Sequence, residues 1–270
     1  MIRFEHVDFS YGTSELMKDI SFTINKGDFV AIVGANGAGK STASKLCNGL
    51  LKPDKGDVLV KGMNTKTTKS SKLARFIGYL FQNPDRQICQ TTIYNEIMFG
   101  LNYTIEDPSK RKAKCEAVLE NFGFDGSKDP FNISRGERQR VALASILAYE
   151  PEILILDEPT TGLDYRECMQ IMDIIADLNQ KGTTILMITH DMEIVQDFAK
   201  RVLVLTNGRL IGDGDCREIM TNRELLASTS VLPAQIPILS LMLGDDFQNV
   251  FSVEDMLERI EILIKKGGNN

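Results

Sequence analysis

The chain has 270 residues and a formal net charge of −6, enough for one large α/β domain with an appendage or for two small domains. The negative balance argues against a protein that coats nucleic acid, although a local basic patch is compatible with it. Five scattered cysteines without metal-ligand or redox spacing indicate reduced thiols. No signal peptide and no apolar run of about 18–20 residues is found, so we expect a soluble chain that reaches a membrane only through a partner.

The first predicted elements are strands. Residues 2–9 and 20–25 alternate and are rich in aromatic and β-branched side chains, which predicts an antiparallel layer. The apolar run 29–33 predicts a buried strand that leads into a glycine-rich stretch and a helix. Two more strands are expected at 58–60 and 75–81.

The pattern becomes helical in the middle of the chain, between residues 83 and 149. Amphipathic spacing predicts helices at about 91–101, 109–122 and 135–149, with turn-rich segments between them. We interpret residues 83–150 as a helical subdomain inserted into an α/β fold.

A parallel sheet resumes after this insertion. The runs 153–157 and 183–189 are continuously apolar, which is typical of strands covered on both faces, and a helix is expected near 166–180. Asn207-Gly208 separates two further β-rich runs and predicts a hairpin. The fold class is therefore α/β, a parallel sheet with an antiparallel β layer, an inserted helical subdomain and a small C-terminal extension.

The C-terminal extension comprises residues 226–270 and follows a main domain over residues 1–225. It begins with a proline-containing segment and ends with an amphipathic helix near 253–265. The apolar face of this helix is formed by Met256, Leu257, Ile260, Leu263 and Ile264. Such a face most often packs on its own domain, but we predict that the extension serves subunit association.

The glycine-rich stretch from Gly34 to Ser41 has the order strand, loop, helix that a phosphate-binding loop requires. Its glycines leave backbone N–H groups free to surround an anion. Lys40 in the first helical turn opposes the helix dipole by about 0.3–1 kcal/mol unless an anion lies there. Ser41 offers a hydroxyl to a magnesium ion. We predict binding of ATP and Mg²⁺ by Gly34, Asn36, Gly37, Ala38, Gly39, Lys40, Ser41 and Thr42.

Two acids stand at the end of the predicted strand 153–157. Asp157 suits a magnesium site, and Glu158 suits a base that polarises a water for attack on the γ-phosphate. A simple helix cap is the alternative for such a pair, but the phosphate loop in the same chain favours the catalytic interpretation.

Gln82 and His190 follow two other predicted strands. Because ligands of α/β sheets bind at the carboxyl ends of strands, both side chains are expected near Asp157 in one crevice. A lone histidine at a strand end is more often structural, but this convergence makes His190 a candidate sensor of the γ-phosphate. Gln82 is also a candidate magnesium ligand.

A second diagnostic stretch covers residues 132–140. Ser134 and Glu137 have the spacing of a capping box that opens a helix. The same helix start favours an anion, and Gly136 in its first turn indicates that something approaches this backbone closely.

These motifs, with Gly162-Leu163-Asp164 between the acid pair and His190, occur in the order found in the ATPase subunit of ATP-binding-cassette (ABC) transporters. The resemblance covers residues 1–225. It implies that Tyr11 stacks on adenine, that Gln82 links the magnesium site to the helical subdomain and that Glu158 is the catalytic base. Without this resemblance, the preferred interpretation of Tyr11 is an ordinary aromatic residue at the end of a strand.

The resemblance also implies a head-to-tail dimer. Ser134, Gly136 and Glu137 would meet ATP bound by the opposite subunit, and Asp164 would lie in a loop that crosses between subunits. Arg135 stands where the family signature usually has a second glycine. We therefore expect pairing with a second, non-identical ATPase and two unequal composite sites, with a homodimer as the alternative.

Within this family, residues 81–87 resemble the energy-coupling factor ATPases of vitamin and metal-ion uptake systems. This similarity implies a motor subunit at the cytoplasmic face of the membrane, bound to an integral membrane coupling subunit and a substrate-binding membrane subunit. We expect a groove near residues 82–103 that receives a helix of the coupling subunit, with Asp85 or Glu96 pairing to its basic residues.

Other functions are less consistent with the sequence. A soluble ABC ATPase that acts on a nucleic acid or a ribosome remains the alternative, but such proteins usually resemble two tandem cassettes or contain a long coiled coil, and we expect no nucleic-acid partner. A GTPase would carry an Asn-Lys-x-Asp motif, which is absent, and a kinase has no need of residues 132–140.

Overall fold

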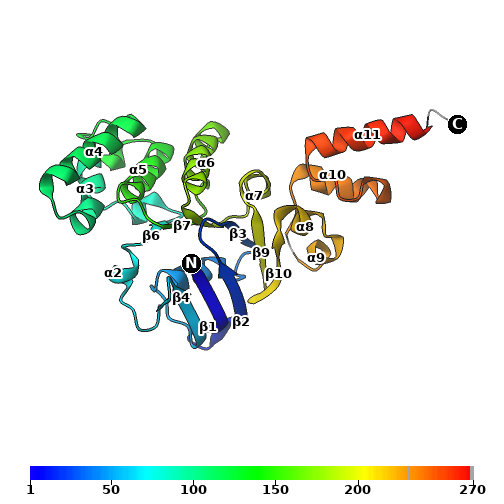
Figure 1. Ribbon diagram of the computed structural model, residues 1–270, viewed down its shortest axis with the longest axis horizontal. Coiled ribbons are helices and arrows are strands. Elements are labelled where there is room, and N and C mark those ends of the chain that lie inside the picture. The colour runs from blue at the N-terminus through cyan, green and yellow to red at the C-terminus, as the bar shows by residue number, and fades with distance from the viewer. Residues whose placement is uncertain (230, 268–270) are drawn as a thin grey trace.

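The computed structural model describes residues 1–229 and 231–267, and its centre is a six-stranded sheet (Figure 1). The strand order is β10-β9-β3-β8-β7-β6, parallel from β9 to β6, with β10 antiparallel at one edge. The strands are β3 (Phe29–Gly34), β6 (Ile77–Leu80), β7 (Ile153–Asp157), β8 (Thr184–Ile188), β9 (Arg201–Thr206) and β10 (Arg209–Asp215). The predicted α/β class and parallel sheet are confirmed.

A second, antiparallel sheet covers one face of the first (Figure 1). Its strands are β1 (Ile2–Tyr11), β2 (Ser14–Ile24), β4 (Lys55–Val60) and β5 (Met63–Asn64). Alternate residues of β3 divide between two cores: Val30 and Ile32 pack with the antiparallel layer, whereas Ala31 and Val33 pack with helices. This two-sided burial explains the continuously apolar strands.

Helices cover the opposite face of the six-stranded sheet (Figure 1). Between β6 and β7 lie α3 (Ile93–Thr104), α4 (Pro108–Phe122) and α5 (Arg135–Leu147), at the positions predicted for the helical insertion. The other helices after β7 are α6 (Tyr165–Gln180), α7 (Met192–Phe198), α8 (Cys216–Thr221), α9 (Arg223–Ala227), α10 (Gln235–Leu243) and α11 (Val253–Gly267). By contrast, α1 (Lys40–Cys47) and α2 (Ser70–Leu73) pack in the core shared with the antiparallel layer.

The predicted hairpin at Asn207-Gly208 joins β9 to β10. Both residues have positive φ, 48° and 72°, as a two-residue turn with the twist of the flanking strands requires. Glycine is needed at the second position, because a Cβ there would lie 2.2 Å from the Leu16 carbonyl oxygen. The hairpin thereby packs against β2.

Helices α10 and α11 extend away from the main body (Figure 1). None of the helices in residues 1–229 and 231–267 is long and apolar enough to cross a membrane.

Candidate functional site

The phosphate loop connects β3 to α1. Gly34, Gly37 and Gly39 have φ values of 150°, 80° and 99°, a region that favours glycine. A Cβ on Gly34 would also lie 2.0 Å from the Leu205 carbonyl oxygen. Gly39 precedes α1 without a side-chain cap, which leaves the first-turn amides of this helix suited to an anion.

Lys40 is buried at the start of α1. Its Nζ donates to the carbonyl oxygens of Gly34 and Ala35, at 2.8 and 3.0 Å, and so closes the loop. Burial lowers the pKa of Lys40, and the carboxylates of Glu158 and Asp157 oppose this effect. A cation held in this way lies where phosphate oxygens would neutralise it.

Asp157, the last residue of β7, accepts two hydrogen bonds. Ser41 Oγ donates to Oδ1 at 2.9 Å, and Tyr79 OH donates to Oδ2 at 3.2 Å. Burial raises the pKa of the Asp157 carboxyl, and the two hydrogen bonds partly offset that shift. A carboxylate and a hydroxyl in contact are hard oxygen donors of the kind that suit Mg²⁺, which needs only one or two protein carboxylates beside phosphate oxygens.

Glu158 follows Asp157 in a left-handed backbone conformation, with φ of 53°. Such a conformation costs about 1–3 kcal/mol and requires support from its surroundings. The Glu158 N–H donates to the Ile188 carbonyl at 2.8 Å, and the side-chain Oε2 lies 2.7 Å from His190 Nδ1. The bend therefore brings the carboxylate to the histidine that follows β8.

A cavity of about 220 Å³ opens at the carboxyl ends of the parallel strands; Asp157 and His190 are not part of its lining but contact the lining residues Ser41 and Glu158. Its lining is formed by Leu16, Asn36, Gly37, Gly39, Lys40, Ser41, Thr42, Gln82 and Glu158. The structure thus brings Gln82 and Glu158 to the phosphate loop. Tyr11 is half-exposed at the end of β1, outside this lining, and its ring meets Phe9 edge-on at 4.9 Å.

The stretch at residues 132–140 lies outside the cavity lining. Ser134 Oγ accepts from the Glu137 N–H at 3.2 Å, and Glu137 Oε2 accepts from the Ser134 N–H at 3.0 Å, so the expected capping box opens α5. These hydrogen bonds lower the pKa of Glu137. Gly136 lies against its own chain: a Cβ there would lie 2.1 Å from Glu167 Oε1, so a larger residue would displace the Glu167 carboxylate.

Glu167 also caps the start of α6, where its Oε2 accepts from the Asp164 N–H at 3.2 Å. Arg135 occupies an ordinary first-turn position of α5, and its guanidinium lies over Gly162: a Cβ on that glycine would lie 3.0 Å from Arg135 Nε. The side chains of Arg135 and Glu167 thus lie between the loop around Asp164 and the start of α5.

Tyr79 and Leu16 belong to the site but were not predicted. Tyr79 OH contacts both Asp157 and Ser44 Oγ, the latter at 2.8 Å. The sequence feature that could have indicated Tyr79 is its hydroxyl, because the rest of its predicted strand end is apolar. Leu16 gives no comparable signal, because an apolar residue on a strand predicts only packing.

A second hollow, of about 960 Å³, lies between α2, β6, α3 and α5, and we call it the α2–α3 groove. Lys72, Arg75, Phe99 and Tyr103 are among its lining residues. The expectation that Glu96 offers a surface carboxylate here is wrong. Glu96 is only 4% exposed, because its carboxylate accepts the N–H groups of Cys89 and Gln90.

Asp85, the other acid expected to meet a partner, is not part of the groove lining. It forms an ion pair with Arg138 of α5 at 3.3 Å and is half-exposed. The charge that the groove itself presents comes from basic side chains of α2 and its flanks.

The ABC transporter family profile matches residues 17–161. A relative in Caldanaerobacter subterraneus, named as an ABC transporter ATP-binding protein, is 41% identical over 261 residues, 95% of this chain and 45% of that protein. A relative of the same kind in Pyrococcus furiosus is 42% identical over 221 residues, 81% of this chain and 85% of that protein. The chain thus spans less than half of the first relative and most of the second.

Solved structures agree with these relatives. CbiO1 of Clostridium perfringens, described as part of the ABC transporter complex CbiONQ, superposes with a TM-score of 0.75 at 30% identity, covering 90% of this chain and 98% of that one. The ATP-binding cassette MJ0796, solved as a post-hydrolysis dimer with ADP and Pi, superposes with a TM-score of 0.72 at 26% identity, covering 80% and 99%.

Proposed function

The chain belongs to the ABC transporter family of ATP-binding proteins, and from this premise we propose that it is the ATP-hydrolysing motor subunit of an energy-coupling factor type importer for a vitamin or a metal ion. The observation that carries the ATPase assignment is the single cavity that joins the phosphate loop to Glu158. The similarity to CbiO1 and the resemblance of residues 81–87 support the importer assignment.

In the proposed reaction the phosphate loop and Lys40 bind the phosphates of ATP. Ser41 and Asp157, with Gln82 adjacent, would hold Mg²⁺, which when bound would supply charge neutralisation at the terminal phosphates. Among the described residues no cluster of three acidic, cysteine or histidine side chains could hold a metal, which fits an ion bound largely by phosphate and water. Glu158 takes a proton from the attacking water, and His190 orients the Glu158 carboxylate.

We assign the exposed start of α5 to ATP on a neighbouring subunit. Ser134 is exposed, and its capping box presents a helix N-terminus that suits phosphate. The neighbour is a non-identical ATPase or a second copy of this chain. Arg135 lies over Gly162, where a glycine at position 135 would place no side chain, and this difference beside the Asp164 loop supports two unequal sites.

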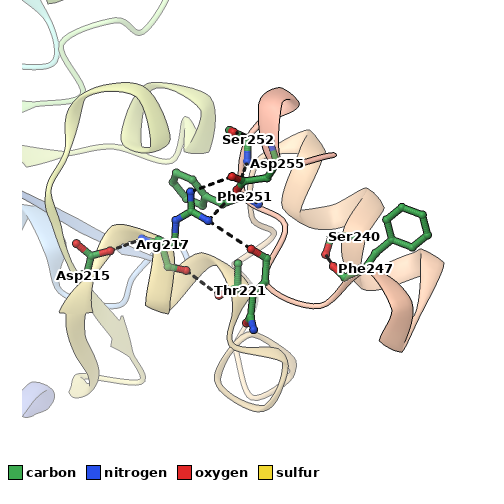
Figure 2. Close-up of polar contacts among 9 residues, drawn as sticks. Asp215, Arg217, Thr221, Ser240, Phe247, Phe251, Ser252 and Asp255 are labelled. Atoms are coloured by element: carbon green, nitrogen blue, oxygen red, sulfur yellow. Dashed lines mark hydrogen bonds and ion pairs between the residues drawn. The ribbon is translucent and has the colours of Figure 1, made fainter. Parts of the chain in front are cut away.

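The C-terminal extension is proposed to join subunits. Arg217 of α8 donates to Asp255 of α11 at 2.7 and 3.3 Å and lies 5.0 Å over the Phe251 ring (Figure 2). This ion pair lowers the pKa of Asp255. The start of α11 is thus fixed, while much of its apolar face is open: Met256 is 7% exposed, but Leu257 and Ile264 are 58% and 68% exposed.

Replacing Leu257 and Ile264 with Glu should raise the dissociation constant between subunits at least tenfold, since burying one such side chain contributes about 1.5–3 kcal/mol. Sedimentation of the purified chain, alone and with its partner ATPase, measures this change. Lys265→Glu is the control, because it alters net charge equally. Unchanged association of the double variant would assign the face to another role. Truncation after residue 228 is a poorer test, because Val231 and Ala234 are buried in the main core.

The α2–α3 groove is proposed to receive a helix of the integral membrane coupling subunit. Its exposed aromatic residues, Phe99 and Tyr103, are the side-chain type that dominates binding surfaces. The chain would thereby reside at the cytoplasmic face of the membrane, and the substrate-binding membrane subunit would join through the same coupling subunit. ATP-driven closure of two ATPases would move their paired grooves together.

The experiment that tests this function measures transport and ATP hydrolysis by the complex in vesicles. Phe99→Asp with Tyr103→Asp should lower both by about tenfold or more while nucleotide binding persists, because the two aromatic contacts are replaced by charge. Ile211→Asp, at another exposed apolar position, serves as control. Normal transport by the double variant would place the coupling site elsewhere. Stable association with a nucleic acid or a ribosome would favour the soluble ATPase instead.

A further inference from the structure

We propose that Lys69, Lys72 and Arg75, here called the basic ridge, bind the anionic headgroups of a phospholipid bilayer. The ridge forms one rim of the α2–α3 groove. This inference rests on the proposed function, since it assumes that the groove side of the chain faces a membrane. It adds a lipid partner to the protein partner proposed for the groove.

The ridge is a local reversal of the overall charge. Residues 66–75 contain four basic and no acidic residues in a chain of net charge −6. Lys66 is engaged elsewhere, because its Nζ donates to the Gly56 carbonyl and lies 3.8 Å from Asp57. Across residues 1–229 and 231–267, Lys69, Lys72 and Arg75 form no ion pair and are exposed.

Backbone hydrogen bonds tie the three cations into one short segment that lines the groove. The Lys72 N–H donates to the Lys69 carbonyl at 2.9 Å, and the Arg75 N–H donates to the Lys72 carbonyl at 3.4 Å. Lys72 lies within α2, Lys69 is its N-cap residue in an extended conformation, and Arg75 follows its C-cap residue Ala74. Leu73, fully buried, anchors the segment from the inner side, so the cations project outward.

The opposite rim of the groove carries exposed aromatic residues. Phe99 and Tyr103 of α3 are 44% and 71% exposed, and their rings pack edge-on at 5.5 Å. The elements α2 and α3 lie at the same end of the molecule, on the left in Figure 1. Tyrosine beside basic residues is the composition of side chains that lie at the headgroup level of a membrane.

The chemistry of the ridge favours lipid over a protein carboxylate. Two of its three charges are lysine ammonium groups on flexible side chains. They act as hydrated point charges, unlike the planar arginine guanidinium, which suits bidentate pairing with a single carboxylate. Headgroups of a fluid bilayer present a diffuse negative potential that such amines match, at about fivefold in binding for each basic residue. Three residues therefore predict about a 100-fold effect.

The test compares vesicles of phosphatidylcholine with vesicles that contain about one third phosphatidylglycerol, by co-sedimentation of the full chain at low and high salt. The wild type should bind the anionic vesicles, and binding should fall in high salt. Lys69→Gln, Lys72→Gln and Arg75→Gln together should weaken binding about 100-fold while ATP binding persists, which shows that the variant is folded.

The matched control replaces Lys26, Lys200 and Arg209 with Gln, exposed residues of the same types outside residues 66–75. It should bind vesicles within about twofold of the wild type. Equal loss in the control, or no binding by the wild type, overturns the proposal. So does a ridge variant that keeps vesicle binding but loses the coupling subunit in detergent, since the ridge would then be a protein contact. If no membrane subunit is found, the proposed function is rejected. The vesicle measurement still decides separately whether the basic ridge binds anionic lipid.

Discussion

Replacing Glu158 with Gln is expected to slow ATP hydrolysis by about 100- to 10,000-fold, the usual contribution of a general base. The amide keeps the size of the side chain and can still contact His190, but it cannot accept a proton from water. Nucleotide binding should persist, because Lys40 and the loop amides do not depend on the Glu158 charge for their positions. Steady-state hydrolysis and ATP binding of the purified complex give the two quantities.

The chain supplies a matched control for this substitution. Glu150 is also a glutamate with φ of 53°, and it pairs with Lys114 outside the cavity lining. Glu150→Gln therefore tests the loss of charge at the same backbone conformation, and it should hydrolyse ATP at the normal rate. Near-normal turnover by Glu158→Gln would remove Glu158 from the catalytic role.

Replacing Asp157 with Asn is expected to raise the Mg²⁺ concentration needed for hydrolysis by about 10- to 150-fold, which corresponds to a charged hydrogen-bonding group worth about 1.5–3 kcal/mol. The carboxylate accepts from both Ser41 and Tyr79, and an amide nitrogen would face one of these two donors. Titration of hydrolysis with Mg²⁺ measures the shift.

Tyr79→Phe is the control for the Asp157 variant, since it removes one of the two hydrogen bonds to the carboxylate, together with the contact to Ser44, and leaves the carboxylate in place. Its effect on the Mg²⁺ requirement should stay below about tenfold. An Asp157→Asn variant with an unaltered Mg²⁺ requirement would contradict the assignment of Asp157 to the metal.

The sheet, the helical insertion and the final hairpin could be predicted from the sequence, because their apolar patterns are long and their turns carry specific residues. The first half of β2 could not. Asp19 has φ of 53°, and the β1–β2 register shifts near Val7, so Met17 and Ile20 are both buried although they lie three residues apart. A bulge of this kind breaks the alternation on which strand prediction depends.

The site shows the same division. Adjacent acids at a strand end and a glycine-rich loop point to phosphate chemistry; in the structure Glu158 lines one cavity with the loop, and Asp157 contacts Ser41 of that lining. The position of Glu96 was not predictable, because its partners are backbone N–H groups that a sequence does not reveal. The fit of Gly136 against Glu167 depends likewise on how closely α5 approaches α6.

The most direct test of the central claim, that this chain drives an integral membrane protein, uses Cys89. Cys89 is exposed and lines the α2–α3 groove, whereas Cys47, Cys115, Cys168 and Cys216 are buried. A photoreactive maleimide on Cys89, activated in native membranes, should form an adduct with a protein that mass spectrometry identifies as membrane-spanning, and Cys89→Ser should abolish that adduct. Adducts only with proteins or nucleic acids that do not belong to the membrane would contradict the account.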